Sequence, residues 1–212
     1  ARFLSVQYTD ARTLRASCRA VLWLVHDTHS SPHRLHACGD GVLELYEKIK
    51  NGYTGIPFPW PSITAMTRGM WPGTLSVFVG RPSVGKTMVA ILTARHAWYH
   101  GKKVLIVSPE MSKEEIAERY FVIDADASYA NMVSGTLDEF SYQKLKKRIN
   151  ETKDMDNLFI LDGRDDLSGP GIDAAIRACQ PDLVGIDSIY RLDFKGDKTE
   201  KSQLALDWAG RS

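Results

Sequence analysis

The chain has 212 residues, of which 43% are hydrophobic and 25% charged, a composition typical of a globular protein with one substantial α/β core. Its formal net charge of +1 excludes a polybasic protein, so any nucleic-acid surface must be local or assembled from several subunits. Three scattered cysteines exclude a disulfide framework and indicate a reducing, cytoplasmic compartment.

The sequence divides into an N-terminal helical or linker segment, residues 1–50, and a larger unit, residues 51–212. In the first segment we expect two helices, over Thr9–Val25 and Val42–Lys50, separated by a polar stretch. The apolar run within the first helix is far shorter than the about 20 residues that span a bilayer, so we expect no membrane association. Asn51–Pro61 is rich in turn-forming residues and is typical of an entry loop.

Four histidines and a cysteine crowd the polar stretch of the N-terminal segment. They are His26, His29, His33, His36 and Cys38. Such spacings are compatible with a zinc site, and equally with a solvated, histidine-rich loop. No Cys-x-x-Cys pair accompanies them, which favours the loop.

From Leu75 onward, apolar runs typical of buried strands alternate with helical patterns. The expected strands cover residues 75–79, 104–107, 158–161 and 183–186, and the expected helices cover 86–100, 112–123, a stretch ending near 149, and 171–179. Ser112 with Glu115, and Thr136 with Glu139, have the spacing of capping boxes at two of the helix starts. Uninterrupted apolar strands between helices predict an α/β fold with a mostly parallel sheet covered on both faces.

One motif carries most of the chemistry. The segment that follows the first of these strands matches G-x-x-x-x-G-K-[ST] in full and opens a helix, as a P-loop requires. Its residues are Gly80, Arg81, Pro82, Ser83, Val84, Gly85, Lys86 and Thr87. The glycines allow the backbone to curl around a phosphate, and the helix N-terminus adds partial positive charge. We therefore predict an ATP site in which Lys86 contacts the β- and γ-phosphates and Thr87 is a ligand of Mg²⁺.

Two acids end other strands of the predicted sheet. Asp187 closes the run Leu-Val-Gly-Ile-Asp, the Walker B pattern, and we expect it to hold Mg²⁺, although any buried strand can end in Asp at a turn. Glu110 follows the strand at 104–107. It can polarise the water that attacks the γ-phosphate, or it can be an acid favoured by the dipole of the next helix, and its spacing alone leaves both interpretations open.

Residues 52–192 resemble the motor domain of DnaB-type replicative helicases, especially those of bacteriophages. Four stretches carry the resemblance: Thr54–Pro57 with Thr67–Gly73, the P-loop with its Arg-Pro-Ser filling, Ser108–Ser112 followed by Arg119, and Gly185–Leu192. The chain departs from the family in two places: the family usually has Leu in place of Pro109 and a Tyr-Leu-Gln-Leu run in place of residues 188–191. The resemblance implies a RecA-like fold and makes Glu110 the catalytic glutamate. Arg119 matches a family arginine, and we assign it no catalytic role.

The resemblance also implies how such a chain works. It implies a homo-hexameric ring around single-stranded DNA, with ATP between subunits driving translocation and strand separation, and a primase and a helicase loader as further partners. The family continues beyond its Walker B strand with a γ-phosphate sensor, DNA-binding loops and an arginine finger. We therefore expect this chain to be a motor domain cut short, from a bacterium or a phage-infected cell.

Two other functions are compatible with the same motifs. A nucleotide-dependent assembly or binding module would use ATP to set its oligomeric state without unwinding DNA. A RecA-like recombinase would share the fold and the P-loop. The Arg-Pro-Ser filling and the Glu110–Met111 pair favour the helicase over the recombinase.

Overall fold

A computed structural model describes the backbone of residues 19–25 and residues 41–52, 54–81, 83–152, 157–189 and 192. The histidine-rich stretch at 26–38 lies outside these residues, as do Pro82 of the P-loop and residues 190 and 191. Within the described part of the chain, no helix is both long enough and apolar enough to cross a membrane.

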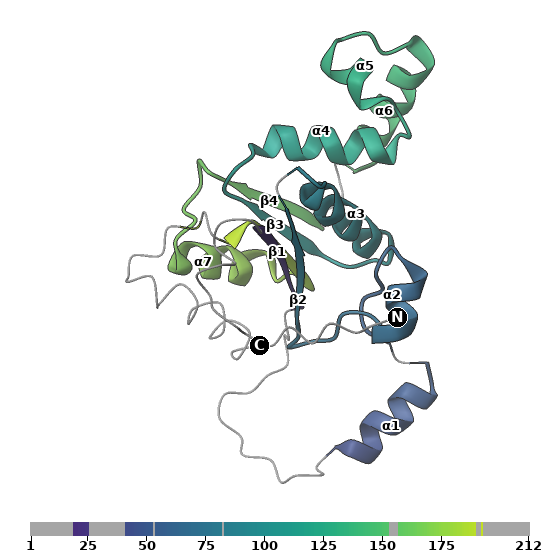
Figure 1. The fold of residues 1–212 in the computed structure, drawn as a ribbon, viewed down its shortest axis with the longest axis vertical. Helices are drawn as coiled ribbons and strands as arrows, with labels where there is room; N and C mark the ends of the chain where they lie inside the picture. Colours follow the sequence, from purple (N-terminus) through teal and green to yellow (C-terminus); the bar gives the residue numbers. More distant parts are fainter. Residues whose placement is uncertain are drawn as a thin grey trace.

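A single five-stranded sheet forms the centre of the molecule (Figure 1). Its strands are β1 (Arg19–Val25), β2 (Leu75–Gly80), β3 (Val104–Ser108), β4 (Leu158–Asp162) and β5 (Leu183–Asp187), in the spatial order β2-β1-β5-β3-β4. β3 is parallel to β4 and β5, whereas β1 is antiparallel to both β2 and β5. Because β2 and β5 both run opposite to β1, four strands share one direction, and the predicted mostly parallel sheet is confirmed.

The strand β1 corrects one prediction. We expected a helix over Thr9–Val25, but residues 19–25 form a strand, and residues 9–18 lie outside the described part. The run Val-Leu-Trp-Leu-Val is made of residues that suit a buried strand as well as a helix. Its backbone groups pair with β2 on one side and β5 on the other, and this long-range pairing overrides the local helical pattern. The division of the chain at residue 50 stays a prediction.

Helices cover both faces of the sheet. They are α1 (Val42–Lys50), α2 (Pro61–Thr67), α3 (Lys86–Tyr99), α4 (Lys113–Asp124), α5 (Tyr129–Val133), α6 (Glu139–Thr152) and α7 (Gly169–Cys179). The side chains of β3 alternate: Val104 and Ile106 pack with α3 and α4, while Leu105 and Val107 pack with Ile172 of α7. Figure 1 accordingly shows α3 and α4 on one side of the sheet and α7 on the other, with α1 apart from both.

The helix starts follow capping chemistry, with one difference from expectation. Both halves of the predicted capping box are present at α4, where the Ser112 side chain accepts from the Glu115 amide and the Glu115 side chain accepts from the Ser112 amide. At α6 the cap is Asp138, whose carboxylate accepts the Ser141 amide at 2.9 Å. The Thr136 hydroxyl lies instead 2.7 Å from the Ser134 hydroxyl, so the predicted box at Thr136 is wrong. Asp caps as well as Thr and stands two residues nearer the helix.

The approach to the P-loop strand is built on a close contact between two chain segments. The Gly55 amide donates to the Arg68 carbonyl at 3.0 Å, and Ile56 and Met70 exchange two backbone hydrogen bonds of 2.8 Å. A Cβ atom on Gly55 would lie only 2.4 Å from the Met70 carbonyl oxygen. Glycine is therefore required at this position, because any side chain would push the two segments apart.

A buried carboxylate ties three helices together. Asp124, at the end of α4 and with a side chain 1% exposed, accepts a hydrogen bond from Arg95 of α3 at 2.8 Å. The Tyr99 hydroxyl donates to the same carboxylate at 2.5 Å, and Arg148 of α6 lies 3.2 Å from it. Burial and proximity to this carboxylate together raise the pKa of Tyr99 above its ordinary value.

We predict that Asp124→Asn lowers the free energy of unfolding by about 2 to 3 kcal/mol, because it removes the charge that both partly exposed arginines neutralise. Urea denaturation measures this change. The matched control is Asp126→Asn, two residues away. The Asp126 side chain is 96% exposed, and its ion pair with Lys144 is long, at 3.8 Å. That change is expected to cost less than about 0.5 kcal/mol, and equal losses in the two variants would contradict the structural role of Asp124.

Candidate nucleotide-binding site

The candidate site lies where the aligned strands end. Gly80 ends β2, Ser108 ends β3 and Asp187 ends β5, and the four strands that share one direction place these ends at one edge of the sheet. β1 separates β2 from β5, so the P-loop strand and the Walker B strand lie two strand spacings apart, about 10 Å. In open α/β sheets this carboxyl edge is where ligands bind.

The P-loop has the strained backbone that phosphate loops use. Ser83 and Gly85 both have positive φ angles, 63° and 88°, the first of which is uncommon for a residue with a side chain. α3 begins immediately afterwards at Lys86. The amides of its first turn, which have no partner within a helix, therefore lie next to the loop. The Lys86 ammonium donates to the Arg81 carbonyl at 2.6 Å, which places the lysine tip within the curve of the loop.

The carboxylate of Asp187 is the point where the predicted site residues meet. It is half-buried, and its side chain is hydrogen-bonded to that of Thr87. Burial is the main reason that the pKa of Asp187 is raised, and the negative charge of Glu110 raises it further. The Thr87 hydrogen bond and the charges of Lys86 and Arg119 act in the opposite direction. The structure therefore brings Lys86, Thr87, Glu110 and Asp187 into one electrostatic neighbourhood, as the sequence predicted that they should meet.

Glu110 is exposed in the loop between β3 and α4, with a contact on either side. The Ser188 hydroxyl lies 3.5 Å from Glu110 Oε1, which is long for a hydrogen bond but places the glutamate beside the residue after Asp187. On the other side, the Met111 amide donates to the Ser108 hydroxyl at 3.2 Å. A hydroxyl and a carboxylate, Thr87 and Asp187, with a second carboxylate nearby, form an oxygen donor set that fits a magnesium ion beside a phosphate.

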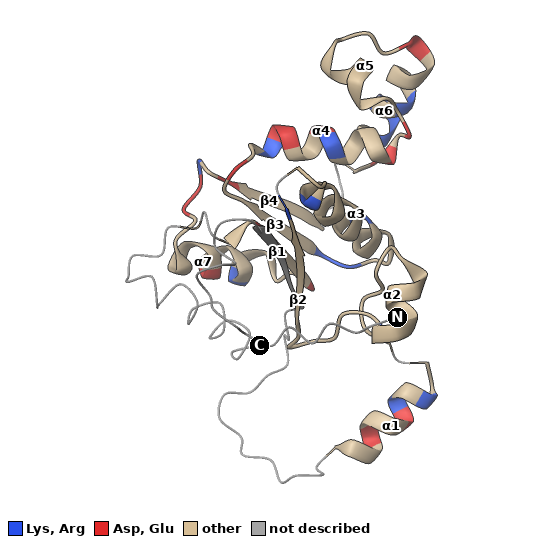
Figure 2. Cartoon of the chain, in the orientation of Figure 1, with Lys and Arg blue, Asp and Glu red and all other residues tan. Residues whose placement is uncertain are grey.

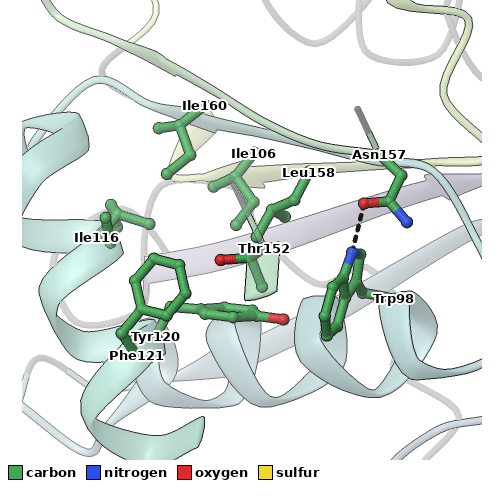
Figure 3. A pocket seen from close by; sticks show the side chains of 10 residues that line it. Trp98, Ile106, Ile116, Tyr120, Phe121, Thr152, Asn157, Leu158 and Ile160 are labelled. Atoms are coloured by element: carbon green, nitrogen blue, oxygen red, sulfur yellow. Dashed lines mark hydrogen bonds between the residues drawn. The ribbon is translucent and has the colours of Figure 1, made fainter. Parts of the chain in front are cut away.

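A separate cavity of about 130 Å³ is lined by residues of α3, α4, β3 and β4 (Figure 3). Its lining is mostly apolar, including Trp98, Ile106, Ile116 and Tyr120, and the Trp98 indole donates to Asn157 at 2.5 Å. It contains none of the P-loop or strand-end residues and carries no arginine or lysine that could bind a phosphate. This cavity therefore does not suit a nucleotide, and the candidate site is assigned from the chemistry of the P-loop and the strand ends.

Sequence reasoning missed two contributors to this edge of the sheet. Ser188 was noted only as a departure from a family pattern, yet it contacts Glu110. Asp162 ends β4 after four apolar residues, Leu158 to Leu161, and so repeats the pattern that singled out Asp187. That repetition was the available signal, but only the structure shows that the two carboxylates have different partners.

The comparisons with known proteins agree with this geometry. Residues 55–206 match the family described as DnaB-like helicase C terminal domain. The chain belongs to this family. A replicative DNA helicase DnaB of Haemophilus influenzae is 32% identical over 131 residues, which cover 60% of this chain and 27% of that protein. A replicative DNA helicase DnaC of Bacillus subtilis is 32% identical over 107 residues, covering 50% and 23%. The chain thus spans about a quarter of the length of these relatives.

Solved structures show the same fold. A structure of a DnaB-like replicative helicase and its interactions with primase matches with a TM-score of 0.63 at 19% identity, covering 85% of this chain and 46% of that one. A second solved structure, of an ATPase domain, matches with a TM-score of 0.54 at 22% identity, covering 68% and 52%. The RecA-like fold that the resemblance implied is confirmed. The roles of the individual site residues stay predictions.

Because the pKa of Asp187 is raised, the site can be tested without measuring ATP hydrolysis. A carboxyl whose pKa is higher in the folded than in the unfolded protein costs stability once the pH rises above its folded-state pKa, because the folded state must then bury a charge. We predict that Asp187→Asn raises the urea midpoint of the nucleotide-free protein at pH 7. This gain should shrink as the pH is lowered through the folded-state pKa of Asp187 toward the ordinary pKa of Asp, about 3.9.

Asp126→Asn, which removes a charge from an exposed side chain, is the control, and its small effect on the midpoint should not vary over the same pH range. A lower midpoint for Asp187→Asn at pH 7 would show that this carboxylate stabilises the fold rather than being held there at a cost.

Proposed function

We propose that this chain is the ATP-driven motor of a replicative DNA helicase. The observation that carries the proposal is the meeting of Lys86, Thr87 and Glu110 around Asp187, at the carboxyl edge of a RecA-like sheet in a DnaB-family chain. Residues 51–212 form most of the motor unit of this proposal, and the preceding segment, residues 1–50, adds the strand β1 to its sheet.

The residues divide the work of ATP hydrolysis. The amides of the P-loop and the Lys86 ammonium bind the β- and γ-phosphates and offset their charge. Thr87 and Asp187 would hold Mg²⁺, which would supply positive charge to offset that of the phosphates. Glu110 accepts a hydrogen bond from the attacking water and aligns it with the γ-phosphate, and Ser188 and the Ser108–Met111 contact hold the glutamate there.

The helicase function also needs partners. We propose a homo-oligomeric ring, a hexamer, that works in the cytoplasm and in which ATP binds between subunits and its turnover moves single-stranded DNA. One of the structural matches is described as a DnaB-like helicase with its interactions with primase, which supports a primase as a partner. A helicase loader is proposed from the family resemblance alone.

We predict that Glu110→Gln lowers the steady-state rate of ATP hydrolysis by about 100-fold or more, because the amide cannot accept the proton of the attacking water. The rate is measured with and without single-stranded DNA, together with the Kd for Mg·ATP. The expected result is a lower kcat with a nearly unchanged Kd. Glu47→Gln, on the exposed helix α1, is the control and should behave as the unaltered chain does.

The same measurements separate the motor from an assembly module. Turnover that single-stranded DNA stimulates, and that Glu110→Gln abolishes, supports the motor. Tight binding of Mg·ATP with nucleotide-dependent oligomerisation and no turnover supports the assembly module instead. Unchanged Mg·ATP affinity in Lys86→Ala would show that the P-loop does not bind the phosphates.

A further inference from the structure

The carboxylate of Asp162 lies at the same sheet edge as that of Asp187 but binds different partners. It ends β4 directly beside Ser108 of β3, and its residue is 1% exposed. The Lys113 amide donates to its Oδ2 at 2.8 Å, and the Arg164 amide donates to its Oδ1 at 2.9 Å. Lys113 is the first residue of α4, so Asp162 caps that helix from a neighbouring strand, where the helix dipole favours a negative charge.

Arg164 completes the neutralisation of this carboxylate. Its Nε lies 3.1 and 3.0 Å from the two oxygens of Asp162, and its Nη2 lies 2.5 Å from Oδ2. The same Nη2 donates to Glu114 in the first turn of α4 at 2.6 Å. These hydrogen bonds, with that of the Arg164 guanidinium the largest cause, hold the pKa of Asp162 far below its usual range. Asp162 is thus a fixed anion at pH 7, with both oxygens occupied.

Asp162 and Arg164 lie beside the loop that carries Glu110. That loop, residues 109–112, joins β3 to α4, and Asp162 and Arg164 hold its far end through Lys113 and Glu114. Gly163, between them, lies against its near end, since a Cβ atom on Gly163 would be 3.5 Å from the Pro109 carbonyl oxygen. Figure 2 shows charged residues of the start of α4 and of the β4–α7 loop at this same end of the sheet.

We propose that Asp162 and Arg164 are positioning residues that fix where the Glu110 carboxylate lies relative to the carboxyl edge of the sheet. This inference rests on the hydrolytic role proposed for Glu110. Neither residue needs to touch nucleotide. Their effect passes through the first turn of α4, whose amide and glutamate they hold. An error of about 1 Å in the position of a catalytic group can lower the rate about 100-fold, so a fixed loop end matters for turnover more than for binding.

The decisive variant is Asp162→Asn. Asparagine keeps the size but offers a single acceptor oxygen and places an NH₂ group against the N–H donors of Lys113 and Arg164. We expect kcat for ATP hydrolysis to fall about 10- to 100-fold while the Kd for Mg·ATP changes less than about 2-fold. Arg164→Ala should lower kcat in the same direction. Arg177→Ala, which breaks an ion pair with Asp173 on α7, is the matched control and should leave kcat unchanged.

A double-mutant cycle distinguishes positioning from general loosening of the fold. If Asp162 acts through Glu110, the variant carrying both Asp162→Asn and Glu110→Gln should hydrolyse ATP within about 2-fold of the rate of Glu110→Gln alone. Asp124→Asn weakens the fold at the other end of α4, so its effect on the rate of ATP hydrolysis should multiply with that of Glu110→Gln instead. Multiplying effects for Asp162→Asn would overturn the inference while leaving the proposed role of Glu110 intact.

A measurement without turnover completes the test. Amide hydrogen exchange across residues 110–113 should be at least about 5-fold faster in Asp162→Asn than in Arg177→Ala, because the Lys113 amide loses the carboxylate that accepts from it. Arg164→Ala should change exchange in the same direction, because Asp162 and Glu114 lose the guanidinium that binds both of them. Unchanged exchange there would overturn the inference whatever the rates show. If Glu110→Gln hydrolyses ATP as the unaltered chain does, or if neither hydrolyses ATP, the proposed function loses its support, and the exchange measurement alone decides whether Asp162 holds the loop.

Discussion

The shared direction of four strands is the constraint on which the candidate site depends. Residues at the ends of β2, β3 and β5 are far apart in the sequence, and the candidate site draws on the segments that follow all three strands. Because the strands point the same way, their loops open at one edge, and the groups they carry meet there. The antiparallel β1 separates β2 from β5 in the sheet, and Thr87, at the start of α3, nevertheless reaches Asp187 at the end of β5.

Two aspartates at this edge show how surroundings, rather than residue type, assign a role. Asp162 and Asp187 both end an apolar strand. Arg164 and two backbone amides satisfy Asp162, so its charge is stable and its oxygens are occupied. Asp187 is half-buried beside another acid, and its pKa is raised, so its charge is costly without a cation. A carboxylate held at a cost is one that a metal ion can stabilise, whereas a satisfied one suits a structural contact.

The sequence predicted those parts of the molecule that local patterns determine. The apolar runs of β2 to β5, the helix α3 that Gly101 ends, and the capping box at Ser112 each depend on residues within a few positions of one another. The failures are of another kind. Residues 19–25 form a strand because both β2 and β5 offer backbone groups that pair with them. The role of Asp162 likewise depends on its contacts with Arg164 and Lys113. Such choices are made by partners that are distant in the chain or by competition between near-equal neighbours, as at Asp138 and Thr136.

The two loops of the candidate site are also connected through the helices they begin. The P-loop opens α3, and the loop of Glu110 opens α4. At their other ends these helices are joined by the buried carboxylate of Asp124, which binds Arg95 and Tyr99 of α3. The two ends of α4 are thus held by different carboxylates: Asp124 joins its C-terminal end to α3, whereas Asp162 accepts from its first amide beside the loop of Glu110. Loss of the first contact should therefore weaken the fold as a whole, and loss of the second should act at the loop of the nucleotide site.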